Sequence, residues 1–258
     1  MIVEAQNNPG APAYQRIAST YRGKIASGEL SPGDQLPTEN AIADQFAVAR
    51  QTVRTGLSLL VTEGLIVARR PRGYFVRERE HMLYRPQEKS RPRPATPEVD
   101  RFSQQISAEG RVPSQRIEVS LVQATPDLAE RLRVDTGATI VARRRVRSIN
   151  GEPTNINDSH FLLEIVKDSE IMSPAYVPRG TDQVLADLGY QQDRAIDEIF
   201  VRMPTPEEIH RLGLGLGTPV AVHYDTGYTA DGRPVRCTVN VLPGDRHKIV
   251  FERSWHDD

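Results

Sequence analysis

The chain has 258 residues, of which 38% are hydrophobic and 26% are charged, and its formal net charge of −1 is typical of a globular protein with room for two modest domains. Its apolar runs fall short of the roughly 18–20 residues of a membrane span, and its N-terminus lacks a secretory signal pattern. Its single cysteine, Cys237, cannot form an intrachain disulfide and is expected to pack within a strand, so we expect a cytoplasmic protein without a membrane partner.

The chain begins with two predicted helices. Apolar side chains recur at helical spacing in the first of them, at Tyr14, Ile17, Ala18, Tyr21 and Ile25. Gly28 is expected to end this helix, and Ser31-Pro32-Gly33-Asp34 predicts a turn. Thr38 is a good N-cap for a second helix that buries Ile42 and Phe46.

A third helix is predicted from Ala49 or Arg50 to Gly64, and it has two different faces. The face expected to be buried carries Val53, Leu57, Leu60 and Val61. A second stripe is rich in hydrogen-bond donors and carries Arg50, Arg54 and Ser58, with Gln51 and Thr55 beside them. A helix that packs on one side and offers donors on the other can enter the DNA major groove, although this stripe alone also fits a solvated surface.

A basic hairpin is predicted directly after the third helix. Residues 65–69 and 74–77 have strand character, and Arg70-Pro71-Arg72-Gly73 between them suits a type I turn. The turn would project two arginines, which the negative potential of a narrow minor groove attracts. A solubilising edge is the alternative for the hairpin alone, but the order of helix, arginine-bearing helix and basic hairpin favours a winged helix-turn-helix.

Residues 12–77 resemble the DNA-binding domain of the GntR family of bacterial repressors. The matching stretches are Leu36-Pro37-Thr38-Glu39, Val48-Ala49-Arg50-Gln51-Thr52-Val53-Arg54, Glu63-Gly64-Leu65-Ile66 and Gly73-Tyr74-Phe75-Val76. The resemblance implies DNA-binding roles for Glu39, Arg50, Gln51, Thr52, Arg54, Arg70, Arg72 and Gly73, with Glu39 orienting the arginines. The chain departs from the family at Ala49, where Ser is usual, and at Pro71, where Gly is usual.

Residues 80–98 contain Pro86, Pro92, Pro94 and Pro97 together with mixed charges, which predicts an extended, semi-rigid linker. The linker would join a DNA-binding domain at 1–79 to a second domain at 99–258. An internal repeat organises the second domain: the stretch from Thr125-Pro126-Asp127 to Asn150-Gly151-Glu152-Pro153 is echoed from Thr205-Pro206-Glu207 to Asp231-Gly232-Arg233-Pro234.

Each copy of the repeat predicts a capped helix, a long strand, a tight turn and a returning strand. Further elements are a helix at 180–188 and a strand at 197–203. The expected fold class is therefore α+β, with a central antiparallel sheet of at least four long strands flanked by helices and a cleft between the two halves.

Three arginines share one face of the strand predicted at 141–147, at Arg143, Arg145 and Arg147. Guanidinium groups gathered in this way need an anionic partner, which could be a carboxylate or phosphate ligand or acidic side chains of the protein itself. A solvated sheet face with cross-strand ion pairs is the alternative.

Residues from about 99 to 253 resemble the UTRA effector-sensing domain of the HutC branch of the GntR family, which has a chorismate-lyase-like fold. The matching stretches are Arg101-Phe102-Ser103, Arg145-Val146-Arg147, Gly151-Glu152-Pro153, Arg179-Gly180-Thr181, Asp231-Gly232-Arg233-Pro234-Val235 and Gly244-Asp245-Arg246. The resemblance is strongest to actinobacterial members. It implies effector-binding positions at Ser103, Arg145, Arg147, Asn157, Ser159, Thr181, Gln183 and Arg236, although sugar-sensing members have acidic groups where Asn157 and Arg236 stand.

These features favour a ligand-responsive transcriptional regulator. We expect a repressor that binds a palindromic double-stranded DNA operator as a homodimer in the nucleoid, needs no cofactor or metal, and is modulated by a small anionic effector. A constitutive DNA-binding repressor whose second domain only dimerises remains an alternative. A chorismate-lyase-type enzyme is disfavoured because the histidines are scattered and no nucleophile–base pattern is present.

Overall fold

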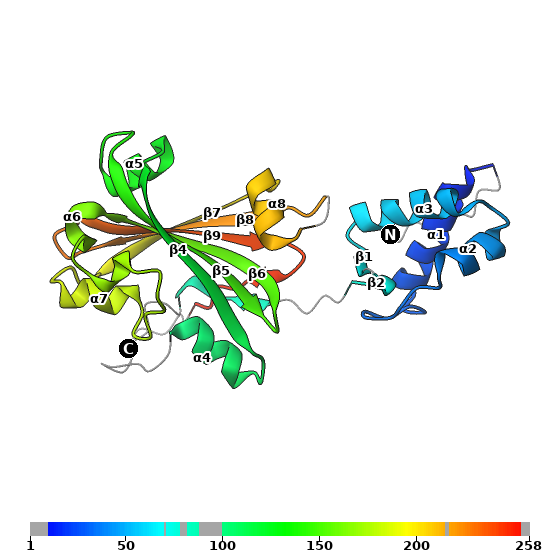
Figure 1. The fold of residues 1–258 in the computed structure, drawn as a ribbon, viewed down its shortest axis with the longest axis horizontal. Coiled ribbons are helices and arrows are strands. Elements are labelled where there is room, and N and C mark those ends of the chain that lie inside the picture. Colours follow the sequence, from blue (N-terminus) through cyan, green and yellow to red (C-terminus); the bar gives the residue numbers. More distant parts are fainter. Residues whose placement is uncertain (1–9, 70, 78–81, 88–99, 215–216, 254–258) are drawn as a thin grey trace. The chain divides into compact units, whose positions relative to one another are not determined.

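The structure is a computed structural model that describes residues 10–69, 71–77, 82–87, 100–214 and 217–253. The chain divides into two compact units, Met1–His81 with Leu214–Thr218 and Met82–Gly213 with Pro219–Asp258 (Figure 1).

The first unit contains helices α1 (Ala13–Ala26), α2 (Glu39–Phe46) and α3 (Arg50–Thr62), followed by an antiparallel hairpin of β1 (Ile66–Arg69) and β2 (Gly73–Val76). This order matches the sequence prediction. Thr38 caps α2 as expected, because its Oγ1 accepts a hydrogen bond from the backbone N–H of Ala41 at 3.2 Å. Ala49 precedes α3 and provides no side-chain cap.

One apolar core holds these helices and the hairpin together. Its buried residues include Ile17, Tyr21, Leu36, Ile42, Val53, Leu57, Leu60, Ile66 and Val76. Val61, expected on the buried face of α3, is only partly buried, and Gly56 is buried instead. A Cβ atom at Gly56 would lie 2.7 Å from the backbone oxygen of Tyr14, so glycine allows α1 and α3 to approach closely.

A six-stranded antiparallel sheet forms the centre of the second unit, in the order β4-β5-β6-β9-β8-β7. Its strands are β4 (Pro113–Gln123), β5 (Thr139–Ile149), β6 (Glu152–Leu162), β7 (Arg194–Arg202), β8 (Val220–Tyr228) and β9 (Pro234–Pro243). The helices around it are α4 (Arg101–Ala108), α5 (Pro126–Leu132), α6 (Leu163–Val166), α7 (Thr181–Asp187) and α8 (Pro206–Leu212), with a 3₁₀ turn at Glu170–Met172.

The predicted internal repeat is confirmed in this sheet. Thr125 caps α5 and Thr205 caps α8, each ahead of a long hairpin formed by β5–β6 or β8–β9. Asn150 and Gly151 join β5 to β6 with φ values of 52° and 82°, as a tight hairpin turn requires. The two halves meet where β6 pairs with β9, which places Asn157 opposite Asn240.

Part of the segment predicted as linker belongs to the second unit. Met82–Tyr84 form the short strand β3, which pairs in parallel with β10 (His247–Ile249). This pairing gives the β3 backbone hydrogen-bond partners, so these three residues are not a solvated linker. Of the remaining expected linker, residues 80–81 and 88–98 lie outside the described part of the chain.

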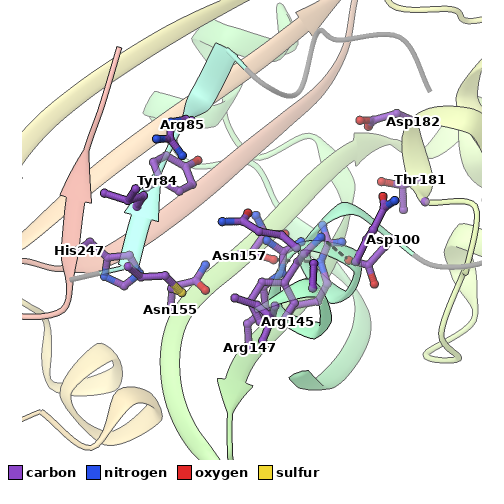
Figure 2. A pocket seen from close by; sticks show the side chains of 18 of the residues that line it. Tyr84, Arg85, Asp100, Arg145, Arg147, Asn155, Asn157, Thr181, Asp182 and His247 are labelled. Atoms are coloured by element: carbon purple, nitrogen blue, oxygen red, sulfur yellow. Dashed lines mark hydrogen bonds between the residues drawn. The ribbon is translucent and has the colours of Figure 1, made fainter. Parts of the chain in front are cut away.

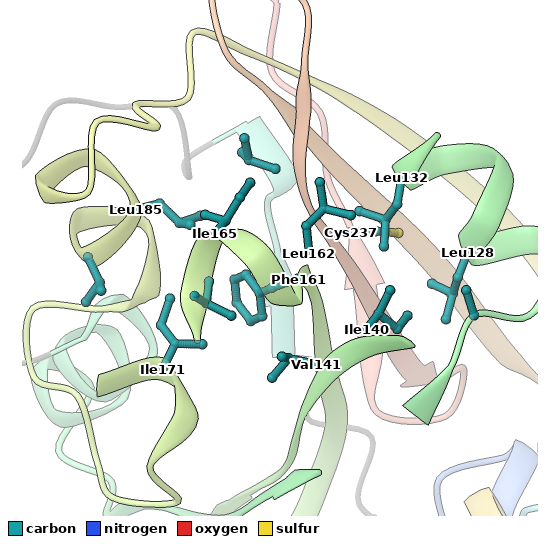
Figure 3. Packing of buried hydrophobic residues seen from close by; sticks show 14 of the residues in the cluster. Leu128, Leu132, Ile140, Val141, Phe161, Leu162, Ile165, Ile171, Leu185 and Cys237 are labelled. Atoms are coloured by element: carbon teal, nitrogen blue, oxygen red, sulfur yellow. The ribbon is translucent and has the colours of Figure 1, made fainter. Parts of the chain in front are cut away.

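The apolar core of the second unit lies between the sheet and its surrounding helices (Figure 3). Phe161, Val141, Leu185 and Cys237 are fully buried in it. Burial raises the pKa of the Cys237 thiol to about 11, which fits a packing role rather than that of a nucleophile. No helix among the described residues is long and apolar enough to span a membrane.

Candidate DNA-binding and effector sites

The exposed side of α3 carries two arginines that share one carboxylate. Glu39 Oε2, at the start of α2, accepts from Arg54 Nε at 2.9 Å and from Arg50 Nη2 at 3.3 Å. The arginine side chains are 52% and 58% exposed, whereas that of Glu39 is 19% exposed. The mostly buried carboxylate of Glu39 therefore sets the direction of two solvent-facing guanidinium groups, which is the role that the resemblance to the GntR family implies for it.

These arginines border a shallow hollow between α2, α3 and the hairpin. Gln35 Nε2 donates to the backbone oxygen of Arg72 at 2.7 Å, which braces the hairpin tip from the turn before α2. Gly73 has φ of 106°, a conformation that favours glycine. Arg70, also predicted to contact DNA, lies outside the described residues.

The N-terminus of α3 opens on the same surface. Gln51 is exposed and Thr52 is half-buried in the first turn of the helix. Because Ala49 supplies no cap, backbone N–H groups at this end remain available to an acceptor such as a phosphate. The arrangement can thus bind the DNA backbone through α3 and present Arg50 and Arg54 to base edges.

A cavity of about 360 Å³ lies in the second unit against one face of the sheet (Figure 2). Five of the predicted effector-binding residues line it: Arg145, Arg147, Asn157, Thr181 and Arg236. Three others do not line it, and each is bonded to another side chain. Ser103 donates to Asp100, Ser159 accepts from Arg145 Nη2 and bonds to Thr238, and Gln183 donates to Asp187 at 3.0 Å.

Arg145 is only weakly compensated by the protein in the cavity. Its Nε donates to the backbone oxygen of Asn157 at 3.1 Å, and its Nη2 donates to Ser159 Oγ. No carboxylate within the described ranges forms a salt bridge with it. Burial, together with the charges of Arg147, Arg143 and Arg236, lowers the pKa of Arg145 to about 9. The site therefore favours an anion at this position.

The neighbouring arginines are compensated to different degrees. Although burial opposes it, Asp182 and Asp225 raise the pKa of Arg236, whose Nη1 and Nη2 lie 3.1 Å from their respective carboxylates. The Arg147 guanidinium lies over the Phe102 ring at 4.8 Å. Burial would raise the pKa of Asp100, but Arg147 and hydrogen bonds from Ser103 and Tyr176 hold it below its ordinary value.

Arg143 does not contribute to the cavity, contrary to the expectation that all three arginines on this strand face an anion. It is 1% exposed and donates to the backbone oxygens of Ile171, Ser173 and Ala175. Its partners are backbone carbonyl groups of the 3₁₀ turn after α6 and of the segment that follows this turn, so Arg143 anchors that segment instead of binding a ligand.

Several cavity residues were not predicted from the sequence, namely Tyr84, Arg85, Asp100, Phe102, Asn155, Asp182 and His247. Tyr84 and Arg85 were assigned to the linker, and only the pairing of β3 with β10 brings them to the site. The Arg101-Phe102-Ser103 stretch did mark this region, but Phe102 rather than Ser103 faces the cavity. The described residues contain no cluster of His, Cys, Asp or Glu suited to a metal ion.

Both units match known protein families. Residues 13–76 match "Bacterial regulatory proteins, gntR family", and residues 108–248 match the UTRA domain. The HTH-type transcriptional repressor NagR of Bacillus subtilis is 30% identical over 93% of this chain and 93% of its own length. The mannosyl-D-glycerate transport/metabolism system repressor MngR of Escherichia coli is 27% identical over 93% of this chain and 95% of its own length.

Solved structures agree with these sequence matches. The crystal structure of a GntR-family transcriptional regulator has 26% sequence identity and a TM-score of 0.61, covering 95% of this chain and 98% of that one. PhnF from Mycobacterium smegmatis, with 21% identity and a TM-score of 0.56 over 93% of this chain and 100% of its own, shares the fold. The chain therefore belongs to the GntR family of bacterial regulatory proteins and is a DNA-binding transcriptional regulator with a UTRA effector domain, not an enzyme.

Proposed function

We propose that the protein is a repressor that binds a palindromic operator as a homodimer through α3 and the β1–β2 wing, and that a small anion bound in the UTRA cavity modulates this binding. The observation that carries the DNA-binding part is the pair Arg50 and Arg54, oriented by one carboxylate of Glu39 at the uncapped end of α3. Two-fold protein symmetry would match a palindromic site. The relatives NagR and MngR, both named repressors, support the sign of regulation.

The experiment for this part is binding of the full chain to a labelled fragment from upstream of its own gene, measured by fluorescence anisotropy at fixed salt. Arg54→Ala should weaken specific binding roughly tenfold or more, because a good base contact contributes about 1–3 kcal/mol. Arg22→Ala is the matched control, since Arg22 is also a partly exposed arginine in an ion pair, with Glu63. Equal affinities of both variants and the wild type would contradict the assignment.

The effector part rests on Arg145, which faces the cavity without a carboxylate partner among the described residues. The name of the relative MngR refers to a glycerate, which is a carboxylate and supports an anionic ligand class. An effector that releases the operator must bind the DNA-incompetent state more tightly than the DNA-bound state. Screening small carboxylates and phosphates by thermal shift, then retesting each hit in the anisotropy assay, checks both steps.

A constitutive repressor with a purely dimerising second domain is the alternative, and one observation favours it. Arg236 is already compensated by Asp182 and Asp225, so part of the positive charge in the cavity is balanced within the protein. Under this alternative, anions that bind the UTRA domain leave the operator affinity unchanged. Under the proposed function, at least one such anion shifts the operator affinity.

A further inference from the structure

The edge strand β7 exposes more large apolar side chains than any other described strand. It ends the six-stranded sheet and pairs with β8, so no described strand lies along its outer backbone edge (Figure 1). Yet Ile196, Phe200 and Val201 have relative exposures of 42%, 43% and 70%, and Met203, directly after the strand, is 57% exposed. Proteins usually protect a long edge strand with a proline, a bulge or a covering element, so an apolar edge of nine residues indicates an interface.

The opposite edge of the sheet is protected in this way. β4 begins at Pro113, and α4 packs against it. Of its eleven described residues, only Leu121 is a large apolar side chain that is exposed, at 55%. Arg116 and Glu118 form an ion pair on its surface at 3.4 Å. The exposed apolar surface of β7 is therefore particular to that strand and is not a general property of the sheet edges.

The charges on β7 are complementary to those of a second copy of the same strand. In an antiparallel pair related by a two-fold axis, directly opposite side chains lie on the same face of the sheet. Full overlap of two β7 strands would place Glu198 opposite its own copy and Arg194 opposite Arg202, which are destabilising like-charge pairs. If the axis passes through Phe200 instead, Glu198 of each copy lies opposite Arg202 of the other. The two strands then form two pairs of opposite charges around a central pair of phenylalanines.

Apolar contact distinguishes this register from the other register that pairs opposite charges. An axis through Ile196 also pairs opposite charges, but it leaves Val201 and Met203 outside the paired segment. The axis through Phe200 places Val201 opposite Ile199 and brings Met203 beside the second strand. Because burial of exposed apolar surface drives association, the axis through Phe200 is favoured.

Local contacts prepare the side chains of β7 for this pairing. The Phe200 ring stacks on Tyr224, with ring centroids 5.9 Å apart and an interplanar angle of 17°, so it is held against the sheet. Glu198 and Arg202 have intramolecular ion-pair partners on α5 and α8, but 47% and 34% of their side-chain surface remains exposed. Each can therefore form a second ion pair across the interface.

We propose that β7 of one chain pairs antiparallel with β7 of a second copy about a two-fold axis at Phe200, so that the two six-stranded sheets form one continuous sheet. This inference rests on the homodimer of the proposed function and deepens it by naming the surface through which the two chains associate. The occupant of the edge is a second copy because the charges of the strand match their own two-fold image. A different protein would not require that symmetry.

Cysteine cross-linking of the full chain tests the pairing. The single native cysteine, Cys237, is fully buried, and burial raises its thiol pKa to about 11, so an engineered surface thiol is the reactive one. Phe200→Cys would place the thiols of the two copies directly opposite each other, with Cα atoms about 4.5–5.5 Å apart, which a disulfide can span. With oxidised glutathione, this variant should form covalent dimers roughly tenfold or more faster than the controls, because pairing raises the effective concentration of the second thiol.

Ile196→Cys is the matched control. Ile196 lies on the same face of the same strand with nearly the same exposure, 42% against 43%. In this register it lies opposite Pro204 of the other copy, so the two Ile196 positions are about eight residues, or roughly 27 Å, apart. Leu121→Cys, on the opposite edge and 55% exposed, measures cross-linking by random collision. Light scattering of the wild type and of the reduced variants records which of them are dimers.

The outcomes separate this inference from the function it rests on. A monomeric wild type at micromolar concentration would overturn both the homodimer and the pairing of β7. A dimeric wild type whose Phe200→Cys variant cross-links no faster than the controls would leave the homodimer standing and overturn the pairing of β7. Faster cross-linking of Ile196→Cys would overturn the axis at Phe200. Loss of the dimer in reduced Phe200→Cys, with the dimer retained in Leu121→Cys, would support the interface, because Phe200 is exposed in the single chain.

Discussion

Replacing Arg145 with Met should stabilise the unliganded protein and abolish its stabilisation by inorganic phosphate. Arg145 is half-buried, its nearest charged neighbours include three other arginines, and its pKa is lowered to about 9. The folded protein therefore carries a charge that its own surroundings disfavour, which is expected of a site built to receive an anion. Methionine has a similar length and removes the charge.

The size of the effect follows from the structure. At about 1.4 kcal/mol per pH unit, the lowering of the Arg145 pKa from its ordinary value to about 9 sets an upper limit of roughly 5 kcal/mol for the cost of this charge. Solvent in the cavity reduces this limit. The substitution also deprives the Asn157 carbonyl and Ser159 Oγ of a donor, at about 1 kcal/mol each. The net gain should be about 1–2 kcal/mol, or roughly 2–8 °C in Tm.

Differential scanning calorimetry at pH 7.5, with and without phosphate, measures both effects. The control is Arg144→Met, because Arg144 is the adjacent arginine and pairs at 3.5 Å with Glu207. Phosphate at ten times its Kd should raise the stability of the wild type and of the control by about 1.4 kcal/mol. It should leave Arg145→Met unchanged.

The pH dependence provides a second check. Above about pH 9, and up to the ordinary pKa of arginine, the unfolded chain holds more protons at Arg145 than the folded chain does, so the wild type gains stability as the pH rises. The advantage of Arg145→Met over the wild type should therefore be complete below about pH 9 and shrink above it. A lower Tm for unliganded Arg145→Met, combined with an undiminished response to phosphate, would refute the reasoning.

Three further predictions concern other parts of the chain. Arg50→Ala should weaken operator binding by roughly 1–3 kcal/mol at fixed salt, measured by anisotropy, and unchanged affinity would remove Arg50 from the interface. Gly56→Ala should destabilise the first unit by roughly 1–2 kcal/mol in urea unfolding, because its Cβ would lie 2.7 Å from the Tyr14 oxygen; a more stable variant would show that helix propensity outweighs the clash. Asp100→Asn should lower the stability above pH 4, where the ionised Asp100 stabilises the folded protein. This difference in stability should disappear as the pH falls through the lowered pKa of Asp100, and a difference that stays constant with pH would contradict the ion interaction with Arg147.

The sequence predicted those elements whose signals are local. The Thr-Pro starts of α5 and α8 and the Asn150-Gly151 turn specify their conformations within a few residues, so the internal repeat could be recognised before the fold was known. The same holds for the arginine face of α3, whereas the role of Glu39, which bonds to both arginines, was implied only by the resemblance to the GntR family.

The missed features depend on pairing between distant segments. β3 is only three residues long and is stabilised by β10 from the other end of the chain, so no local pattern identified it. The spacing of Arg143, Arg145 and Arg147 correctly placed them on one face. It could not show that the Arg143 guanidinium donates its hydrogen bonds to backbone carbonyl oxygens of a distant segment. His223 was one of several scattered histidines until the sheet register placed it between Asn240 and Asp197.

Selection of DNA fragments from the host genome by the purified full-length protein, with its own upstream region included, tests the central claim most directly. The account predicts enrichment of one palindromic sequence, whose binding is weakened roughly tenfold or more in Arg54→Ala and retained in Arg22→Ala. Salt-sensitive binding without sequence preference would contradict it, because α3 and the wing would then hold only phosphates and could not direct the protein to an operator.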